Sequence, residues 1–270
     1  MRCEFIAIGT ELLLGQIVNS NAAWLGEQLA LAGIDCVYHV TIGDNRQRMH
    51  DTIQQALDRS DAVIVSGGLG PTQDDITREV IADVMKVGLI RDDEIAERIR
   101  HRFESRGRIM SENNLKQADI PDGGVAIPQM PGTAPGLICP VGEKIIYAVP
   151  GVPFEMKMMV NECVLPDLKQ RSGITSVIKS RVLKTWGQTE SGLDEMLTER
   201  MAYLDDKGGA TIAFQASGIE GLKVRLTVKK ESEEAAERAL AEEEKSVREI
   251  IGDYIFGTDD ETMESVVLDL

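Results

Sequence analysis

The sequence predicts an α/β fold, a three-layer sandwich with a mostly parallel sheet, followed by a small α+β domain. Three observations lead to this prediction. Strand and helix patterns alternate along residues 1–170, the loops between them are short, and a smaller β-α-β-β-α pattern follows. Such alternation is typical of a parallel sheet covered by helices on both faces. Ligands of these sheets bind beyond the carboxyl ends of the strands, where the loops meet.

The first domain, residues 1–170, should contain five strands and five helices. The apolar runs predict strands at Cys3–Ile8, Asp35–Thr41, Ala62–Val65, Gly136–Cys139 and Lys144–Val149. Helical spacing predicts helices at Asn21–Ala32, Arg46–Asp58, Thr77–Val87, Asp92–Arg106 and Phe154–Gln170. The last two strands form a hairpin or lie side by side. Pro166 predicts a break in the last helix, because proline cannot donate the helical hydrogen bond.

The second domain, residues 171–257, reads as a β-α-β-β-α unit. Its strands are expected at Thr175–Thr185, Ala210–Gln215 and Leu222–Lys229, and its helices at Thr189–Ala202 and Glu233–Ile251. The segment Gly218–Gly221 has the spacing of the nucleic-acid clamp of KH domains, but the unit is not basic, so a hairpin turn is favoured. Residues 258–270 are expected to be a tail or the lead-in to an absent domain, with an amphipathic helix beginning at Glu261.

Composition excludes some partners and favours a cellular compartment. The 270 residues include 29 basic and 45 acidic side chains, a formal net charge of −16. This charge argues against nucleic acid or an anionic membrane as the main partner. The chain runs from Met1 directly into a strand without a signal peptide, and no apolar run approaches the length of a membrane span. The four scattered cysteines suit a reducing compartment, so we expect a cytoplasmic protein.

The segment Val65–Thr77, a glycine-rich turn between a strand and a helix, is the most informative motif. Backbone N–H groups at Gly67, Gly68 and Gly70 can approach a bound anion, and the helix N-terminus adds positive partial charge. Two carboxylates follow, Asp74 and Asp75. A carboxylate pair beside a phosphate cradle suits a divalent cation that bridges protein and phosphate. The alternative is an ordinary turn in which an aspartate caps the next helix.

Two other strand-end loops add polar candidates. After the first strand, Thr10, Asn19 and Asn21 could hydrogen-bond ribose or phosphate, and Glu11 could contact ribose or assist a metal; the alternative is a connection in which Ser20 caps the next helix. After the second strand, Asp44 could be a helix cap, as could Asn45. Together with Asp75, Asp44 could instead hold a hydrated magnesium ion.

Three more segments contribute candidates for binding. Lys116 could neutralise phosphate as a point charge, and it stands in the polar run Asn113–Ala118 with Asn114. The loops Met130–Gly136 and Val149–Met156 supply Thr133 and Gly151, and Thr72 lies in the glycine turn. The chain contains neither the dinucleotide fingerprint GxGxxG after its first strand nor the P-loop pattern.

Together these motifs resemble the CinA family of competence/damage-inducible proteins. The motifs that carry the resemblance are IGTELLLGQIVNSNAAWL at Ile8–Leu25, GDN at Gly43–Asn45, GGLGPTQDDITRE at Gly67–Glu79, NLKQA at Asn114–Ala118, PGTAPG at Pro131–Gly136 and PGVPFEM at Pro150–Met156. The resemblance implies a molybdopterin-binding-like fold, a KH-type second domain and a homodimer. It implies hydrolysis of ADP-ribose to AMP and ribose 5-phosphate with a divalent metal, and roles for Asp44 and Asp75 through the aspartates of molybdopterin-binding relatives.

The leading hypothesis is therefore a pyrophosphatase that depends on Mg²⁺, Mn²⁺ or Co²⁺ and acts on a small-molecule nucleotide. Asp44 and Asp75 would hold the metal, with Asp74 as a third candidate ligand. Two alternatives stay open. One is a module that binds a nucleotide or a pterin without hydrolysis, and the other is an adenylyltransferase related to molybdenum-cofactor biosynthesis. Many bacterial members carry a further domain that deamidates nicotinamide mononucleotide, and that activity is not assigned to these residues.

Overall fold

The computed structural model describes residues 1–128, 130–216 and 221–268. The chain forms two compact units. The first unit comprises Met1–Ala30 and Ile34–Gly173, and the second comprises Leu31–Gly33 and Ile174–Leu270. The expected boundary at residue 170 falls in the last helix of the first unit, α7 (Leu165–Ser172).

A six-stranded mixed sheet forms the centre of the first unit, in the order β2-β1-β3-β8-β7-β6. Its strands are β1 (Arg2–Ile8), β2 (Asp35–Ile42), β3 (Ala62–Ser66), β6 (Val125–Ala126), β7 (Leu137–Val141) and β8 (Lys144–Val149). The four strands β2, β1, β3 and β8 run parallel, whereas β7 pairs antiparallel with β8 and with β6. The predicted α/β class is confirmed, and β7 and β8 form the hairpin that was one of the two alternatives.

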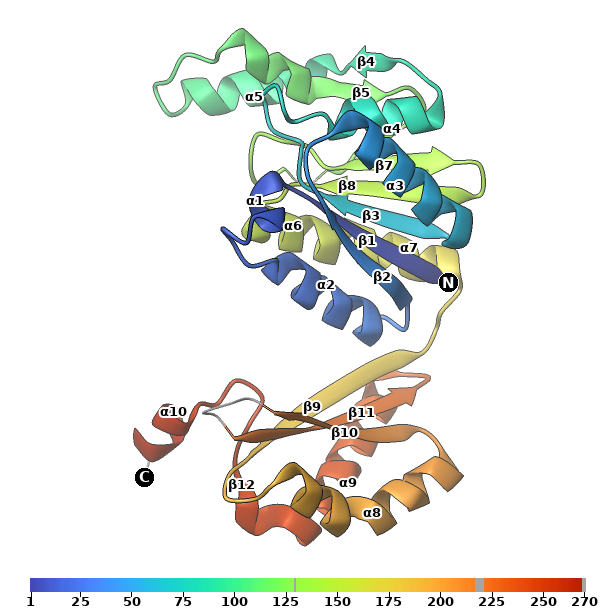
Figure 1. Cartoon of the computed structure of the whole chain (residues 1–270), viewed down its shortest axis with the longest axis vertical. Coiled ribbons are helices and arrows are strands. Elements are labelled where there is room, and N and C mark those ends of the chain that lie inside the picture. The colour runs from blue at the N-terminus through green and yellow to red at the C-terminus, as the bar shows by residue number, and fades with distance from the viewer. Residues whose placement is uncertain (129, 217–220, 269–270) are drawn as a thin grey trace. The chain divides into compact units, whose positions relative to one another are not determined.

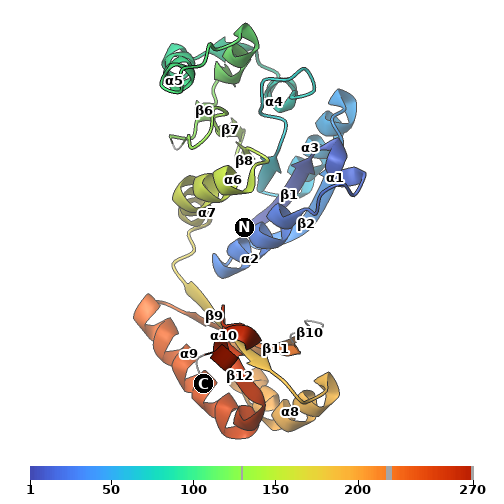
Figure 2. The same ribbon diagram turned by 90° about the vertical axis from the view of Figure 1, so that its left-hand side faces the viewer.

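Helices cover both faces of this sheet (Figures 1 and 2). All five residues of β3 are buried, as expected for a parallel strand covered on both sides. Helices α3 (Arg46–Arg59) and α4 (Thr77–Met85) pack their apolar side chains against Ile6 and Val65 on one face. Helices α2 (Ser20–Leu31), α6 (Pro153–Met159) and α7 lie on the other face.

The predicted break at Pro166 is wrong, because the chain stays helical from α6 to α7. A π-helical segment, η2 (Val160–Val164), connects α6 to α7, and Pro166 lies in the first turn of α7. A π-helical turn shifts the backbone hydrogen-bond register, and proline is tolerated in the first turn of a helix. The chain therefore passes Pro166 without leaving the helix.

Several short elements were not expected. They are α1 (Thr10–Leu13), β4 (Leu89–Arg91), the 3₁₀ helix η1 (Glu112–Ala118), β5 (Asp119–Pro121) and β6. Strands β4 and β5 pair antiparallel as a separate two-stranded sheet, near α5 (Asp93–Glu104) in Figure 1. Segments this short carry too few residues for apolar periodicity to reveal them.

The second unit is a four-stranded antiparallel sheet with two long helices on one face (Figure 1). Its elements are β9 (Val177–Thr185), α8 (Glu190–Lys207), β10 (Ala210–Ala216), β11 (Leu222–Lys230), α9 (Glu233–Ile251), the 3₁₀ turn η4 (Gly252–Tyr254), β12 (Ile255–Thr258) and α10 (Met263–Leu268). The β-α-β-β-α order is as predicted, and β12 was not expected. Strands β10 and β11 pair antiparallel, but three of the four residues of the predicted turn Gly218–Gly221 lie outside the described residues.

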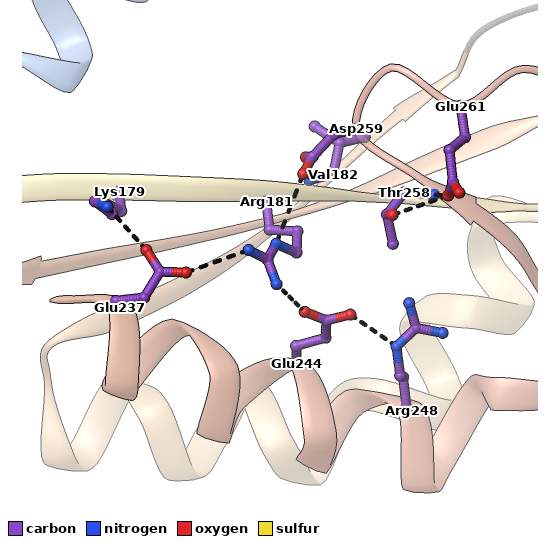
Figure 3. A network of polar contacts seen from close by, with 9 residues as sticks. All are labelled: Lys179, Arg181, Val182, Glu237, Glu244, Arg248, Thr258, Asp259 and Glu261. Carbon is purple, nitrogen blue, oxygen red and sulfur yellow. Dashed lines mark hydrogen bonds and ion pairs between the residues drawn. The ribbon is translucent and has the colours of Figure 1, made fainter. Parts of the chain in front are cut away.

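An ion-pair network joins β9 to α9 in the second unit (Figure 3). Arg181 on β9 donates to Glu244, at 2.5 Å, and to Glu237, at 3.4 Å, both on α9. Glu237 also accepts from Lys179, and Glu244 accepts from Arg248, each at 2.8 Å. These cations of β9 and α9 therefore meet acidic partners within their own unit.

Candidate functional site

The loops that carry the predicted site all leave the same edge of the first sheet. Because β1, β2, β3 and β8 run parallel, their carboxyl ends lie together, and the chain leaves them at Gly9, Gly43, Gly67 and Pro150. A glycine or proline at each exit allows the backbone to turn tightly there. The sheet thus gathers four segments that are distant in the sequence.

Asp44 joins the loop after β2 to the loop after β1. Its Oδ2 accepts hydrogen bonds from the backbone N–H of Thr10, at 3.0 Å, and from the Thr10 hydroxyl, at 2.9 Å. Asn45, and not Asp44, caps α3, because the Asn45 side chain accepts from the N–H of Arg48 at 3.0 Å. The capping alternative for Asp44 is therefore excluded.

The glycine turn has a backbone that only glycine adopts readily. Gly67 and Gly68 have φ angles of 109° and 66°, and a Cβ atom at either would collide with Ile8 or with Thr77. The N–H of Gly67 donates to the carbonyl of Val149 at 3.0 Å, so the predicted phosphate contact by this group is replaced by a link to β8. The N–H groups of Gly68 and Gly70 have no backbone acceptor in the part of the chain that the structure describes.

Asp75 folds back onto the turn instead of capping α4. Its Oδ2 accepts from the N–H of Thr72 at 2.9 Å and from the Thr72 hydroxyl, and its carboxylate fills the place that a Cβ at Gly70 would need. The residue at the cap position of α4 is Ile76, which makes no side-chain cap. Helix capping therefore does not account for either aspartate of the motif.

Lys116 reaches the glycine turn from η1. Its Nζ donates to the carbonyl of Thr72 and, at 2.8 Å, to the carbonyl of Asp75. This contact brings Lys116 to the motif, where its ammonium group, predicted to neutralise phosphate, holds the loop backbone. Asn114 is buried and turns toward Ser111, to which its amide donates at 2.7 Å, so it supports η1 locally.

Arg78 is a residue of the site that the sequence did not reveal. Its side chain is fully buried in the first turn of α4, and it donates to the carbonyls of Leu69 and Gly70 in the preceding turn. Its Nε is buried without a partner among the described residues. Burial lowers the pKa of Arg78, whereas Glu79, Asp75 and Asp119 act in the opposite direction. A buried cation thus lies directly behind the glycine turn.

The carboxylates suit a hard divalent cation. Asp44 and Asp75 each use Oδ2 for protein hydrogen bonds, and Oδ1 of each has no hydrogen-bond partner among the described residues. Asp74 is exposed, and its pKa lies below the usual range, chiefly because the Thr72 hydroxyl donates to it and also because its own backbone N–H and Lys116 favour the anion. Carboxylate oxygens with water and phosphate complete the ligand set that Mg²⁺ prefers. Within residues 1–128, 130–216 and 221–268 no three acidic, histidine or cysteine side chains form a metal cluster, so substrate oxygens and water would have to supply the remaining ligands.

A cleft of about 130 Å³ opens beside α2. Glu11, Asn19, Asn21 and Gly151, all predicted to bind substrate, line it. Asn19 accepts from the N–H of Ala22 at 3.1 Å and so caps the start of α2, which the alternative had assigned to Ser20. Asn21 donates to the carbonyl of Gly151 at 2.8 Å, which links α2 to the loop before α6.

The loop Pro131–Gly136 is held from α5 and approached from α6. Arg102 donates to the carbonyls of Met130, at 3.0 Å, and of Pro131. The Glu155 carboxylate lies where a Cβ at Gly132 would stand, and burial raises the pKa of Glu155 against the opposing effect of Arg102. Thr133, the predicted binding residue, is half-buried in this loop and lines neither the cleft nor the glycine turn.

The structure therefore assembles two groups from the predicted residues. Thr72, Asp74, Asp75 and Lys116 meet at the glycine turn, while Glu11, Asn19, Asn21 and Gly151 form the cleft. Asp44 and Thr10 form a contact of their own, and the chain joins Thr10 directly to Glu11 in the cleft.

Among the described residues, no helix has both the length and the apolar character needed to cross a membrane.

Two different family models match the two structural units of the chain. A family model described as a probable molybdopterin binding domain matches residues 4–170, and another, described as the damage-inducible protein CinA KH domain, matches residues 180–257. CinA-like proteins of Frankia casuarinae and Nostoc punctiforme are 44% and 42% identical to this chain over its whole length. The chain spans 63% and 64% of the length of these relatives.

A solved structure is similar to part of the chain. The crystal structure of the protein CinA with unknown function from Thermoplasma acidophilum is 34% identical, with a TM-score of 0.56. It covers 64% of this chain and 98% of its own. The chain therefore belongs to the CinA family, with a molybdopterin-binding-like domain followed by a KH-type domain.

Proposed function

We propose that this chain hydrolyses the pyrophosphate bond of ADP-ribose to AMP and ribose 5-phosphate in a reaction that depends on a divalent metal. The observation that carries the proposal is the pair Asp44 and Asp75, each with one carboxylate oxygen left without a described partner. The glycine turn beside Asp75 offers the N–H groups of Gly68 and Gly70 to an anion. Carboxylates and unused N–H groups that follow parallel strands at one edge of the sheet suit a metal-bound pyrophosphate.

Each group has a distinct part in the reaction. Asp44 and Asp75 would hold the cation, which would supply a Lewis acid for the pyrophosphate oxygens and for water. The N–H groups of Gly68 and Gly70 donate to phosphate oxygens as negative charge develops on them. Lys116 and Arg78 donate to different carbonyls of the turn, and these bonds would hold the direction of those N–H groups. The cleft at Asn21 receives the part of the substrate beyond the phosphates.

The test is release of AMP from ADP-ribose with Mg²⁺, Mn²⁺ or Co²⁺, followed by removal of the metal with EDTA. Repeated turnover that stops with EDTA supports the proposal, and the Asp75→Asn variant should then lose it. Asp58→Asn is a matched control, because Asp58 is an exposed carboxylate on α3 whose hydrogen bond among the described residues comes from Gln54. Absence of AMP with all three metals would refute the hydrolase.

A second candidate is a module that binds a nucleotide or a pterin without hydrolysing it. The observation that favours it is the family model for residues 4–170, which is described as a probable molybdopterin binding domain. A stoichiometric complex that persists with metal and yields no product would support this candidate. An adenylyltransferase is the third candidate, and it would require ATP or an adenylated pterin as substrate.

A further inference from the structure

We propose that the cleft beside α2 binds the adenine base of the nucleotide and selects it by its exocyclic amine. This inference rests on the proposed function, because it assigns the base of that substrate to a defined part of the site. The cleft lies next to the phosphate-binding turn along the chain. Ser66, which lines the cleft, precedes Gly67, and Glu11, which also lines it, follows Thr10.

The walls of the cleft are mainly apolar. The apolar residues that line it are Ala7, Ile8, Leu12, Ile17, Val18 and Pro153. Ala7 and Ile8 are buried at the end of β1, whereas Ile17 and Val18 are exposed. Apolar walls fit the flat faces of a heterocyclic base, and a ribose ring, which presents hydroxyl groups all round, would leave them in contact with polar atoms.

One acceptor on the polar side of the cleft has no hydrogen-bond donor among the described residues. Asn21 is only 9% exposed, and its amide nitrogen is used by the carbonyl of Gly151. Its Oδ1 is buried and has no partner in the described chain. A buried acceptor without a donor is costly, so a ligand that supplies an N–H group there gains binding free energy. The Glu11 carboxylate adds a second acceptor to the same lining.

This arrangement distinguishes adenine from hypoxanthine. Adenine carries an amine at the position where hypoxanthine carries a carbonyl oxygen. The amine can donate to Asn21 Oδ1, whereas the carbonyl would bring a second acceptor against it. A site built around such a contact rejects the analogue that lacks the donor, because the protein acceptor is then left unpaired.

The experiment compares the binding of AMP, IMP and ribose 5-phosphate to the full chain by isothermal titration calorimetry. AMP should bind at least about tenfold more tightly than IMP, the effect of one unsatisfied buried acceptor. Asn21→Leu removes the acceptor and should bring the affinities for AMP and IMP within about twofold of each other. It should leave the affinity for ribose 5-phosphate unchanged, because that product has no base.

Asn21→Asp is the matched variant, because it keeps an acceptor and loses the donor to Gly151. It should retain the preference for AMP even if overall affinity falls. Circular dichroism checks that both variants fold. If Asn21→Leu does not fold, equal affinities of the wild-type chain for AMP and IMP, or loss of the preference in Asn21→Asp, would still overturn the inference.

Failure of this inference differs from failure of the proposed function. Equal affinities of the wild-type chain for AMP and IMP would overturn the base assignment, even if ADP-ribose is hydrolysed. A preference that survives in Asn21→Leu would overturn it as well. A clear preference for AMP that disappears in Asn21→Leu would support the assignment of the base to the cleft. If the same chain releases no AMP from ADP-ribose, the proposed hydrolysis is refuted while the base assignment stands.

Discussion

The Asp44 carboxylate accepts hydrogen bonds from both the backbone N–H and the hydroxyl of Thr10, at 3.0 and 2.9 Å. One oxygen, Oδ2, takes both bonds. The contact joins the loops after β2 and β1, which are neighbours in the sheet. Asp75 is held in the same manner by the N–H and hydroxyl of Thr72. Each aspartate is thus oriented through one oxygen while the other remains available.

Asp75→Asn and Asp44→Asn are each expected to lower the turnover of ADP-ribose at least about 100-fold, the upper end of the loss seen when a group supporting a metal ligand is removed. An amide oxygen can still accept from Thr72 or Thr10, so the free energy of unfolding should change little. Steady-state AMP release and urea unfolding measure the two effects. Turnover in Asp75→Asn close to that of the Asp58→Asn control would remove Asp75 from the mechanism.

Arg78→Met is expected to destabilise the first unit by about 1–3 kcal/mol, because buried carbonyls of the glycine turn lose their donor. Gln117 also donates to the carbonyl of Leu69, at 3.3 Å, so this carbonyl keeps one donor in the variant. Arg78→Lys keeps the charge but has fewer donors. Its free energy of unfolding should therefore lie between those of Arg78→Met and the wild type. Urea unfolding gives the stability of each variant, and equal stability of Arg78→Met and the wild type would show that the contact does not hold the turn.

Thr72→Val is expected to raise the pKa of Asp74 toward its ordinary value, because the Thr72 hydroxyl is the main cause of the depression. A depressed carboxyl pKa stabilises the fold at pH values above the unfolded pKa, here 3.8, and this contribution is lost as the pH falls through the folded value. The variant should therefore lose less stability in acid than the wild type. NMR titration of the Asp74 carboxyl carbon measures the pKa.

Thr198→Val serves as the control for that titration, because the Thr198 hydroxyl donates to the carbonyl of Asp194 in the second unit. An unchanged Asp74 titration in Thr72→Val would contradict the assigned cause.

Arg181→Met is expected to reduce the acid sensitivity of the second unit. The pKa of Glu237 is lowered chiefly by its hydrogen bond from Lys179, with a smaller effect of Arg181. The pKa of Glu244 is raised by burial but lowered more by Arg181 and Arg248. Their contribution is present above the ordinary glutamate pKa of 4.5 and disappears as the pH falls through the lower folded values.

Thermal unfolding between pH 6 and pH 3 tests this expectation. The wild type should lose stability in this range, and Arg181→Met should start lower and lose less. Arg238→Met is the control, since Arg238 is an exposed cation on the same helix α9 with no ion pair among those described. If the stability of Arg181→Met falls with pH in parallel with that of the wild type, the ion-pair network is not the source of the acid sensitivity.

Much of the candidate site was predictable because parallel strands place their exits at one edge. The predictions for Asp75, Thr72 and Lys116 needed only the strand–turn–helix pattern and polar residues nearby, and the structure brings these three into contact. Whether Asp44 or Asn45 capped α3 stayed open, because both residues cap helices well. The structure decided which residue is the cap, because the Asn45 side chain accepts from Arg48 whereas the Asp44 carboxylate accepts from Thr10.

Arg78 could not be predicted, for a physical reason. In the sequence it reads as a polar residue in the first turn of an amphipathic helix, where arginine is normally exposed. Its burial arises because the glycine turn folds over the start of α4, with the N–H of Thr77 donating to the carbonyl of Gly68 at 3.1 Å. That contact depends on positive φ angles that composition alone does not display.

The sequence by itself determined the order of the main strands and helices, the two domains' classes and the strand ends that carry polar residues. These properties follow from local periodicity and from the positions of glycine and proline. Only the tertiary structure decided which side chains meet: Asp44 with Thr10, Lys116 with the glycine turn, Asn21 with Gly151. Such contacts join residues far apart in the chain, and their geometry is set by how helices pack on the sheet, which no local pattern encodes.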